Sequence, residues 1–248
     1  MISTISVVIM AKDAEKTLQE TLESLVSFKE VILYLNNSTD RSKSIAQEFK
    51  NVQIIEGAFI GFGSTKNKAA EYASNPWIFS LDSDEVVSQE LLEELNSLTL
   101  EEPKEVFKLK RDNYFLGKHV KYSGWGKDLL TRIYNTTHHK FNQNMVHEFV
   151  ELTNDTKVTQ LKHSFRHNAV EDLNQFLQKI MKYSDLAAKD KKTCCFVIVV
   201  LKAQFAFFKT YFLQLGFLDG WRGFVIATSN FNGKFYRYTK RYINCKIK

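Results

Sequence analysis

The stretch "WIFSLDSDEVVSQELL", residues 77–92, joins an apolar run to a cluster of acidic side chains. Residues 77–82 are mostly apolar, as expected of a buried strand. Three carboxylates follow within four residues, Asp82, Asp84 and Glu85, before a helical pattern begins. Because like charges repel, this cluster needs a positive partner. A divalent cation holding a diphosphate would provide one, and an acidic N-cap for the following helix is the simpler alternative.

Three other apolar runs precede this stretch, at residues 5–10, 30–35 and 52–56, with helical patterns between them. The first helical pattern places Leu18, Leu22 and Leu25 on one face. Ser38 is a candidate cap for the second helix, with Asp40 in its first turn. Alternating strands and helices predict an α/β fold, a Rossmann-like, mostly parallel sheet flanked by helices. Such sheets bind ligands beyond the carboxyl ends of their strands, where the acidic cluster lies.

The pattern changes after residue 105. The segments "EVFKLKR", "DLLTRIY" and "VHEFVEL" are typical of strands, and "DLNQFLQKIMKYSDLAA" is typical of a helix. The remainder is helical and basic. We expect one domain over residues 1–190 and a basic, aromatic-rich helical C-terminal extension over residues 191–248.

The positive charge is concentrated in the C-terminal quarter. Residues 186–248 carry twelve Lys or Arg against two Asp, whereas the whole chain carries a net charge of +6. The same quarter holds 14 of the 33 aromatic residues. A basic, aromatic-rich extension on a mildly acidic body indicates an anionic surface as a partner.

The extension also has an apolar helical stripe, formed by Leu201, Phe205, Phe208, Phe212 and Leu215. No window approaches ~20 uncharged apolar residues, so we expect a peripheral contact with an anionic membrane, not a spanning helix. An amphipathic helix packed on the domain is the alternative.

The N-terminus shows no signal peptide. Three cysteines without metal-ligand spacing suit reduced thiols in a cytoplasm.

Several segments, taken in order, resemble the inverting glycosyltransferases of family 2, which have the GT-A fold. They are "VVIMAKDAEKTLQETLESL", "NNSTDRS", "GFGSTKNKAAEYASNPWIFSLDSDE", "GWGKDLLTRIYN", "VHEFVEL", "HSF", "KYSDLAA" and "YFLQLGFLDGWRGF". The resemblance covers nearly the whole chain. Within the family the chain looks most like bacterial lipopolysaccharide inner-core β-1,4-glucosyltransferases.

The resemblance implies transfer of a hexose from a UDP-sugar, such as UDP-glucose, to a lipopolysaccharide or lipooligosaccharide core, with inversion. It implies Mg²⁺ or Mn²⁺ as cofactor, a glycolipid acceptor, and a cytoplasmic protein peripheral on the inner membrane. Asp84 would bind the metal and Asp82 would lie near the ribose. The donor site would comprise Ala11, Lys12, Asp13, Asn36, Asn37, Lys66, Asp82, Ser83 and Arg132.

One position departs from the family pattern. The family usually has an Asp after the second strand that contacts the base, and this chain has Leu35. Leu35 cannot accept a hydrogen bond from a uracil imide, whereas the amides of Asn36 and Asn37 can donate or accept.

Four candidate residues also have a structural interpretation. Lys66 either reaches the nucleotide or lies on the surface. Arg132 shares a strand face with apolar residues, so it needs a diphosphate, an acceptor anion or a structural Glu as partner. His163 either completes the metal site or is structural. Trp125 either stacks on a sugar or packs in the core.

The catalytic base is predicted in "NMVHEFVEL". Direct displacement with inversion requires a carboxylate that takes the proton of the acceptor hydroxyl. Strand alternation would place Glu148 between two valines on one face, and His147 and Glu151 on the other. The family position also falls on the His147-Glu148 pair, and we favour Glu148. A salt bridge from Glu148 to Arg132 is the alternative.

Two other functions remain open from the sequence. A nucleotidyltransferase could use the same Asp-x-Asp pattern, although it would not need a carboxylate in "VHE". A non-enzymatic basic protein could bind membrane or nucleic acid. No recognised nucleic-acid-binding module is visible, so nucleic acid is not an expected partner.

Overall fold

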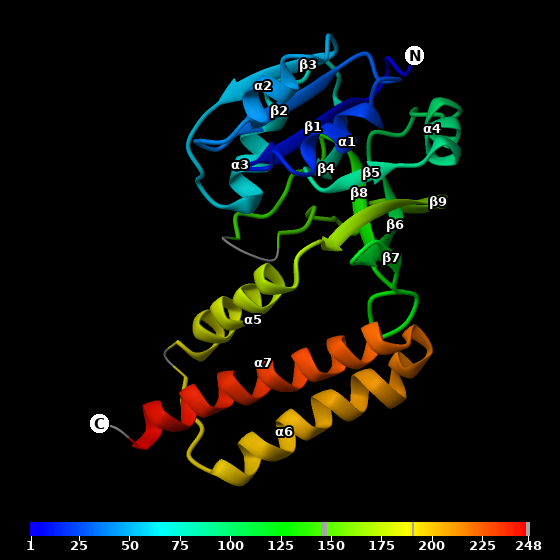
Figure 1. Ribbon diagram of the computed structural model, residues 1–248. Coiled ribbons are helices and arrows are strands. Elements are labelled where there is room, and N and C mark those ends of the chain that lie inside the picture. The colour runs from blue at the N-terminus through cyan, green and yellow to red at the C-terminus, as the bar shows by residue number, and fades with distance from the viewer. Residues whose placement is uncertain (145–147, 190, 247–248) are drawn as a thin grey trace. The chain divides into compact units, whose positions relative to one another are not determined.

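The computed structural model of the chain describes residues 1–144, 148–189 and 191–246 (Figure 1). The chain forms two compact units. Unit 1 consists of Met1–Arg111 and Leu129–His167, and unit 2 consists of Asp112–Asp128 and Asn168–Lys248.

Unit 1 contains the four strands expected from the apolar runs. Its strands are β1 (Ser6–Ala11), β2 (Val31–Leu35), β3 (Val52–Glu56), β4 (Trp77–Asp82), β5 (Glu85–Val87) and β8 (Leu129–Asn135). Its helices are α1 (Leu18–Glu23), α2 (Ser42–Ala46), α3 (Phe62–Ala70) and α4 (Gln89–Asn96). Two longer strands, β6 (Glu105–Phe115) and β9 (Lys157–Val170), begin in unit 1 and end in unit 2.

The sheet has the order β3-β2-β1-β4-β8-β6-β9-β5. The strands β1 to β4 pair in parallel, and β8 pairs antiparallel with β4. Because β1, β2 and β4 run the same way, their carboxyl ends lie at one edge, with Ala11 opposite Leu35 and Met10 opposite Asp82. The predicted α/β architecture with a mostly parallel sheet at its start is confirmed.

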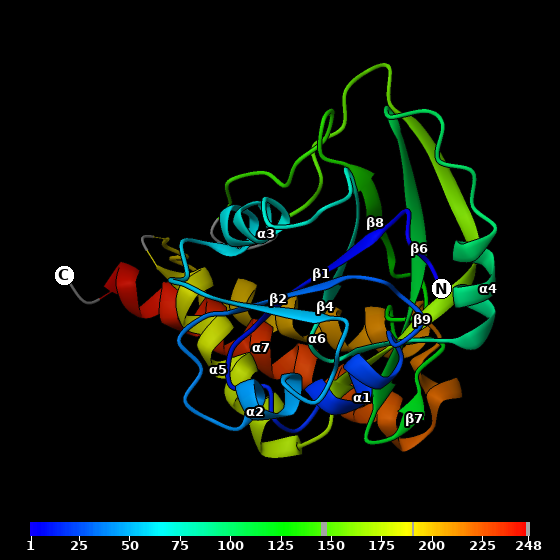
Figure 2. The ribbon, with the colours of Figure 1, turned by 90° about the horizontal axis from the view of Figure 1, so that it is seen from above.

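Helices cover both faces of this sheet, with α1 and α2 on one side and α3 on the other (Figure 2). The strand residues alternate accordingly. Val7 and Ile9 belong to the same buried cluster as Leu18 of α1, whereas Val8 belongs to the cluster that includes Ala69 of α3. The two-residue period of the strands therefore divides the core of unit 1 into two layers.

Two local predictions were wrong, and one strand was missed. The segment "VHEFVEL" is not a strand in its described part, where Val150 forms only an isolated bridge with Phe141. Ser38 does not cap α2, because its Oγ accepts a hydrogen bond from the backbone N–H of Asp13. Asp40 instead accepts from the N–H of Ser42, at 3.0 Å. Strand β9 had no counterpart in the sequence interpretation.

Unit 2 consists mainly of helices. Its elements are β7 (Lys118–His119), α5 (Leu173–Ala188), α6 (Phe196–Phe208), a π-helical turn η1 (Lys209–Leu213), a 3₁₀ turn η2 (Gly216–Asp219) and α7 (Trp221–Lys246). Helix α7 packs against both α5 and α6. The helical C-terminal region is therefore as predicted. The expected domain boundary near residue 190 falls within unit 2, since α5 belongs to the same unit as α7.

A disulfide between Cys194 and Cys245 joins the segment before α6 to the end of α7. The prediction of three reduced thiols was therefore wrong, and Cys195 alone is free in the described part of the chain. The two paired cysteines are 51 residues apart in the sequence, and the packing of α6 against α7 brings them together. Because disulfides are typical of oxidising compartments, cysteine usage no longer supports a cytoplasmic location.

One helical stretch, Phe196–Leu213, is long and apolar enough to cross a membrane by length and composition. The sequence interpretation had excluded such a window. Lys202 and Lys209 lie within the stretch, and most of it is not buried in the protein.

Candidate active site

The loops after β1 and β2 are tied to each other at the carboxyl edge of the sheet. Asp13 and Asn37 both adopt left-handed backbone conformations, with φ of 49° and 52°. Asp and Asn tolerate this conformation better than other non-glycine residues. The carboxylate of Asp13 accepts a hydrogen bond from the N–H of Thr39 at 2.8 Å. Lys12 beside it is exposed. Two predicted donor-site segments therefore lie together.

Asn36 lies between these loops and is buried. Its N–H donates to the carbonyl of Ala11 at 2.9 Å, which extends the pairing of β1 and β2. Its side-chain Oδ1 has no hydrogen-bond partner among the described residues. A buried acceptor without a donor is unfavourable. Leu35, by contrast, packs within the apolar core. Asn36 therefore offers an acceptor where Leu35 cannot.

Two cations neutralise Asp82 at the end of β4. Lys66 Nζ lies 2.8 Å from Asp82 Oδ1, and Arg132 Nη2 lies 2.9 Å from Asp82 Oδ2. Burial alone would raise the pKa of the Asp82 carboxyl, but Lys66 and Arg132 hold that pKa well below its ordinary value. Asp82 is therefore ionised, and the repulsion inferred from the sequence is balanced by side chains.

Glu85 is the deepest carboxylate of the cluster and is fully buried. Its side chain contacts Arg132 and, at 3.2 Å, Arg111. Its second oxygen accepts the backbone N–H of Asp82 at 3.0 Å. Arg132 thus has the structural Glu partner that the sequence left open, in addition to Asp82. This network fixes the end of β4.

Glu148 contacts the same network through Lys66. Its Oε1 lies 3.0 Å from Lys66 Nζ, so the buried Lys66 bridges Glu148 and Asp82. The alternative salt bridge from Glu148 to Arg132 does not form; Lys66 takes that role. A cavity of about 580 Å³ in unit 1 is lined by Lys66, Asp82, Arg132 and Glu148, among other residues. A volume of this size suits a small-molecule ligand. His147 lies outside the described residues.

Asp84 points to a different neighbour. The Oδ2 atom of Asp84 lies 3.4 Å from Nε2 of His167, a residue of β9 that pairs with Glu85 of β5. His163 lies four residues earlier on β9 and instead contacts Glu94 of α4 at 2.9 Å. The predicted role of His163 at the metal therefore conflicts with its position, because four strand residues span roughly 13 Å.

The donor atoms near Asp84 suit a divalent cation. A carboxylate and an imidazole fit Mn²⁺, and Mg²⁺ is commonly held by one or two carboxylates together with substrate phosphates. Within the described ranges, no group of three or more acidic, His or Cys side chains forms a complete metal site. The remaining ligands would therefore come from the substrate and water. Ser83, between the two aspartates, is anchored through its carbonyl to Thr21 Oγ1 at 3.0 Å.

The sequence interpretation missed Arg111 and His167 and gave Glu85 no role of its own. Glu85 was visible as the third carboxylate of the opening stretch. On a strand, His163 and His167 would point to the same face. This signal could be used only if β9 had been predicted as a strand. Trp125, for which the sequence left sugar stacking and core packing open, belongs to unit 2, where its ring packs near Phe115 and Phe176.

The family model described as "Glycosyl transferase family 2" matches residues 6–165. An uncharacterized glycosyltransferase of Rickettsia prowazekii is 26% identical over 260 residues, which cover 95% of this chain and 86% of the relative. One from Rickettsia bellii is 23% identical, covering 95% and 85%. The crystal structure of S. aureus TarS 1-349 is 14% identical, with a TM-score of 0.45, covering 94% of this chain and 81% of that chain.

Proposed function

Because this chain belongs to glycosyl transferase family 2, and is therefore a glycosyltransferase, we propose that it transfers a hexose from a UDP-sugar to a lipopolysaccharide or lipooligosaccharide core. UDP-glucose is the proposed donor, and the reaction inverts the anomeric centre. The observation that supports this proposal is that Lys66 forms ion pairs with both Asp82, at the end of β4, and Glu148, and all three line the cavity. The ammonium group of Lys66 thus contacts both Asp82, on the proposed donor side, and Glu148, on the proposed acceptor side.

The nucleoside would occupy the edge formed by the loops after β1 and β2. Asn36 supplies the acceptor for the uracil imide, because its Oδ1 is buried and has no partner among the described residues. Asp13 and Asn37 flank this position on their strained backbone turns. The replacement of the usual Asp by Leu35 is then compensated by the next residue.

The diphosphate would lie beside Lys66 and Arg132. Both cations are almost fully buried, and a cation withheld from water interacts more strongly with a phosphate. Asp84, with His167 beside it, would hold the divalent metal. When bound, such a metal neutralises charge that develops on the leaving diphosphate. Asp82 positions Lys66 and Arg132 and lies next to the ribose.

Glu148 would act as the general base. The acceptor hydroxyl attacks the anomeric carbon, its proton passes to the Glu148 carboxylate, and the bond from that carbon to the diphosphate oxygen breaks. The carboxylate is half-buried and lines the cavity. Its ion pair with Lys66 orients it toward the side on which the donor diphosphate would bind.

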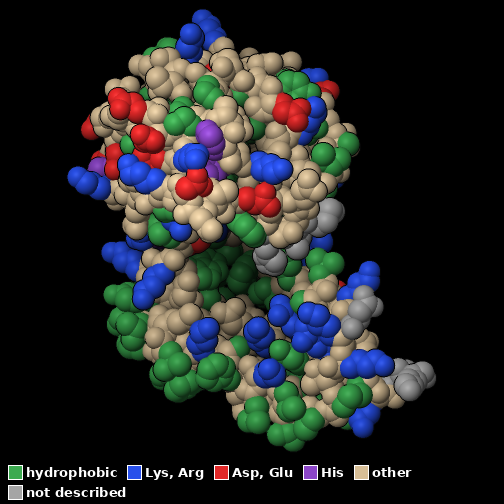
Figure 3. Space-filling model, turned by 180° about the vertical axis from the view of Figure 1, so that it is seen from behind, with side chains coloured by type: hydrophobic (Ala, Val, Ile, Leu, Met, Phe, Trp, Pro, Cys, Tyr) green, Lys and Arg blue, Asp and Glu red, His purple; other side chains and the backbone are tan. Residues whose placement is uncertain are grey.

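The acceptor would be presented by a membrane. Along α6, η1 and η2, large apolar side chains are exposed, including Leu201, Phe205, Phe212, Leu213 and Leu218. On the face of unit 2 seen in Figure 3, hydrophobic side chains lie beside groups of Lys and Arg. This combination suits a helix pair lying in the interface of an anionic bilayer. The proposed location is the cytoplasmic face of the inner membrane.

A donor screen tests the proposed function. The purified full chain is incubated with Mn²⁺ and UDP, GDP, dTDP or CMP, and the thermal midpoint is measured. UDP at a hundred times its Kd should stabilise the protein by about 2.7 kcal/mol. UDP-glucose with a lipooligosaccharide acceptor should then give free UDP and a glycan larger by one hexose. Stabilisation by no nucleotide would contradict the proposal.

A further inference from the structure

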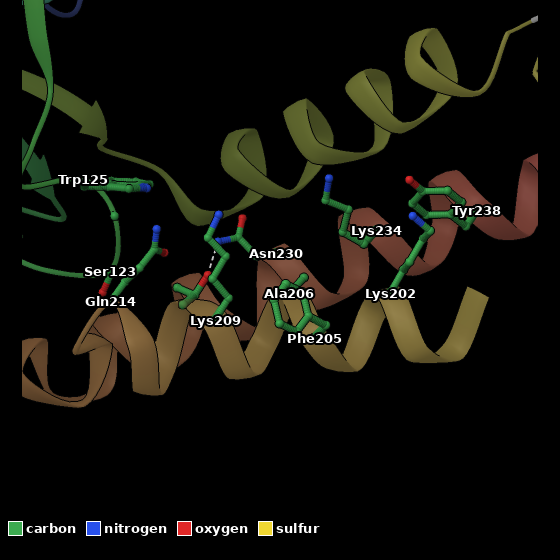
Figure 4. Close-up of a pocket in the computed structure, with 12 residues that line it drawn as sticks. Ser123, Trp125, Lys202, Phe205, Ala206, Lys209, Gln214, Asn230, Lys234 and Tyr238 are labelled. Atoms are coloured by element: carbon green, nitrogen blue, oxygen red, sulfur yellow. Dashed lines mark hydrogen bonds between the residues drawn. The ribbon is translucent and has the colours of Figure 1, made fainter. Parts of the chain in front are cut away.

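Unit 2 contains a second cavity that the proposed reaction does not use. It has a volume of about 450 Å³ and is lined by residues of α6, η1, α7 and the 123–125 loop. Figure 4 shows Trp125 and Gln214 at one end, Lys209 and Asn230 in the middle, and Lys202, Lys234 and Tyr238 at the other end. All of these residues belong to unit 2, so the cavity is complete within that unit.

The lining is strongly cationic. Lys202, Lys209 and Lys234 line the cavity, and no acidic side chain does so among the described residues. Between residues 196 and 246 the only acid is Asp219, against eight Lys or Arg. Asp219 is already engaged, because it accepts hydrogen bonds from Ser123 Oγ and from two backbone N–H groups. The three lysines therefore have no carboxylate that neutralises them within the cavity.

Nearby cations increase this excess. Burial and the neighbouring charges of Arg237 and Lys202 lower the pKa of Lys234. Arg237 lies one turn after Lys234, and its Nε is buried without a hydrogen-bond partner among the described residues. Arg241 lies one further turn on, with its guanidinium 4.8 Å from the Tyr238 ring centroid. The Arg241 guanidinium also donates hydrogen bonds to the carbonyl of Ala187. Because no acidic side chain lines the cavity among the described residues, this group of cations favours binding of an anion.

Polar groups that donate hydrogen bonds accompany the lysines. Asn230 Nδ2 donates to Thr210 Oγ1 at 2.9 Å, which fixes its amide at the cavity wall. Gln214 provides a second amide near Trp125. Lysine ammonium groups and amide N–H groups together suit the several oxygens of a phosphate. The indole of Trp125 offers an apolar surface for whatever carries that phosphate.

We propose that this cavity binds a phosphomonoester or diphosphate group, held by Lys202, Lys209 and Lys234, with the carrier of the phosphate toward Trp125. Dianionic groups are favoured over a phosphodiester because three lysines and no acidic side chain line the cavity among the described residues. The phosphate can come from a soluble compound or from a lipid in the membrane. The residues of this cavity belong to unit 2, whereas those of the proposed donor site belong to unit 1.

Calorimetric titration of the full chain with inorganic pyrophosphate tests the soluble source, with sodium chloride at the same ionic strength as reference. Lys209→Gln/Lys234→Gln should weaken binding by roughly tenfold for each lysine, because each loses a charge-assisted hydrogen bond. Lys179→Gln/Lys182→Gln is the matched control, since both residues are exposed on α5 and lie outside the cavity.

Co-sedimentation tests the lipid source. Phosphatidylcholine vesicles contain either phosphatidic acid, a phosphomonoester, or phosphatidylglycerol, a phosphodiester, at equal surface charge. A preference for phosphatidic acid that Lys209→Gln/Lys234→Gln loses and the α5 control keeps assigns the site to a lipid phosphate.

The two arms together decide the proposal. Loss specific to the cavity variant in either arm supports the site and identifies the source. Equal binding by the cavity and control variants in both arms overturns it. Circular dichroism checks folding, and if the double variant is unfolded, the single change Lys209→Gln is measured instead, with the same criterion. Lys209→Arg/Lys234→Arg retains both charges and should retain binding.

Discussion

The ammonium group of Lys66 lies 2.8 Å from Oδ1 of Asp82, although Lys66 is only 2% exposed. A lysine withheld from water is costly unless it is paired. Here it is paired twice, since Glu148 lies 3.0 Å from the same nitrogen. Lys66 therefore holds the carboxylates of Asp82 and Glu148 close together, and its removal leaves both without this partner.

Replacing Lys66 by Gln should therefore affect both stability and donor binding. We expect a loss of about 1–3 kcal/mol in the free energy of unfolding, below the full effect of breaking a buried pair because Asp82 is partly exposed. The Kd for UDP should rise at least about tenfold. Lys68→Gln, on the exposed face of the same helix, is the control. Denaturant unfolding and calorimetry measure the two effects, and an unchanged Kd would argue against a diphosphate contact.

The sequence predicted the parallel core of unit 1 well because its strands are continuous apolar runs separated by helical patterns. It placed Asp82, Lys66 and Arg132 in one site, which the structure confirms as neighbours. The contact of Lys66 with Glu148 was not predictable from strand alternation, because the described residues from Glu148 onward do not form the expected strand. Its position depends on packing against α3, to which Asn67 contributes hydrogen bonds with the backbone of Phe141.

The metal prediction concerns Asp84. Asp84→Asn removes the negative charge of the proposed metal ligand and retains its shape, so Mn²⁺-dependent turnover of UDP-glucose should be abolished while the fold is retained. Manganese electron paramagnetic resonance in the presence of UDP measures binding directly. Asp155→Asn, an exposed carboxylate paired with Lys104, is the control. Near-normal activity with unchanged metal dependence would show that Asp84 is not a ligand.

Substituting the two histidines of β9 one at a time distinguishes the metal-site role proposed for His167 from the role that the sequence predicted for His163. His167 lies 3.4 Å from Asp84, whereas His163 contacts Glu94. His167→Ala should weaken Mn²⁺ binding by about 10–100-fold, the usual effect of losing a metal ligand or a residue that orients one. His163→Ala should leave Mn²⁺ affinity within about twofold. The reverse result would restore the original prediction for His163.

Membrane binding should depend on the exposed aromatic residues of unit 2. Phe205→Ser/Phe212→Ser removes two side chains that are 59% and 48% exposed, so their loss does not disturb a core. Each buried Phe contributes about 1.5–3 kcal/mol to partition, and co-sedimentation with vesicles rich in phosphatidylglycerol should fall sharply. Phe59→Ser/Phe62→Ser, two exposed residues of unit 1, is the control. If the wild-type protein binds neutral vesicles as well as anionic ones, or binds neither, a contact with anionic membrane is contradicted.

Glu148→Gln tests the catalytic base. The change keeps the shape of the side chain and removes its basicity, so kcat should fall by roughly 10²–10⁴-fold, the usual contribution of a general base. The Kd for UDP should change little, since the proposed nucleotide contacts lie at Asn36, Lys66 and Arg132. Glu151→Gln is the control, because that side chain is exposed three residues away. If kcat collapses in His147→Ala and the Glu148→Gln enzyme stays active, the base is His147. The reason is that the attacking hydroxyl cannot dispense with the group that accepts its proton.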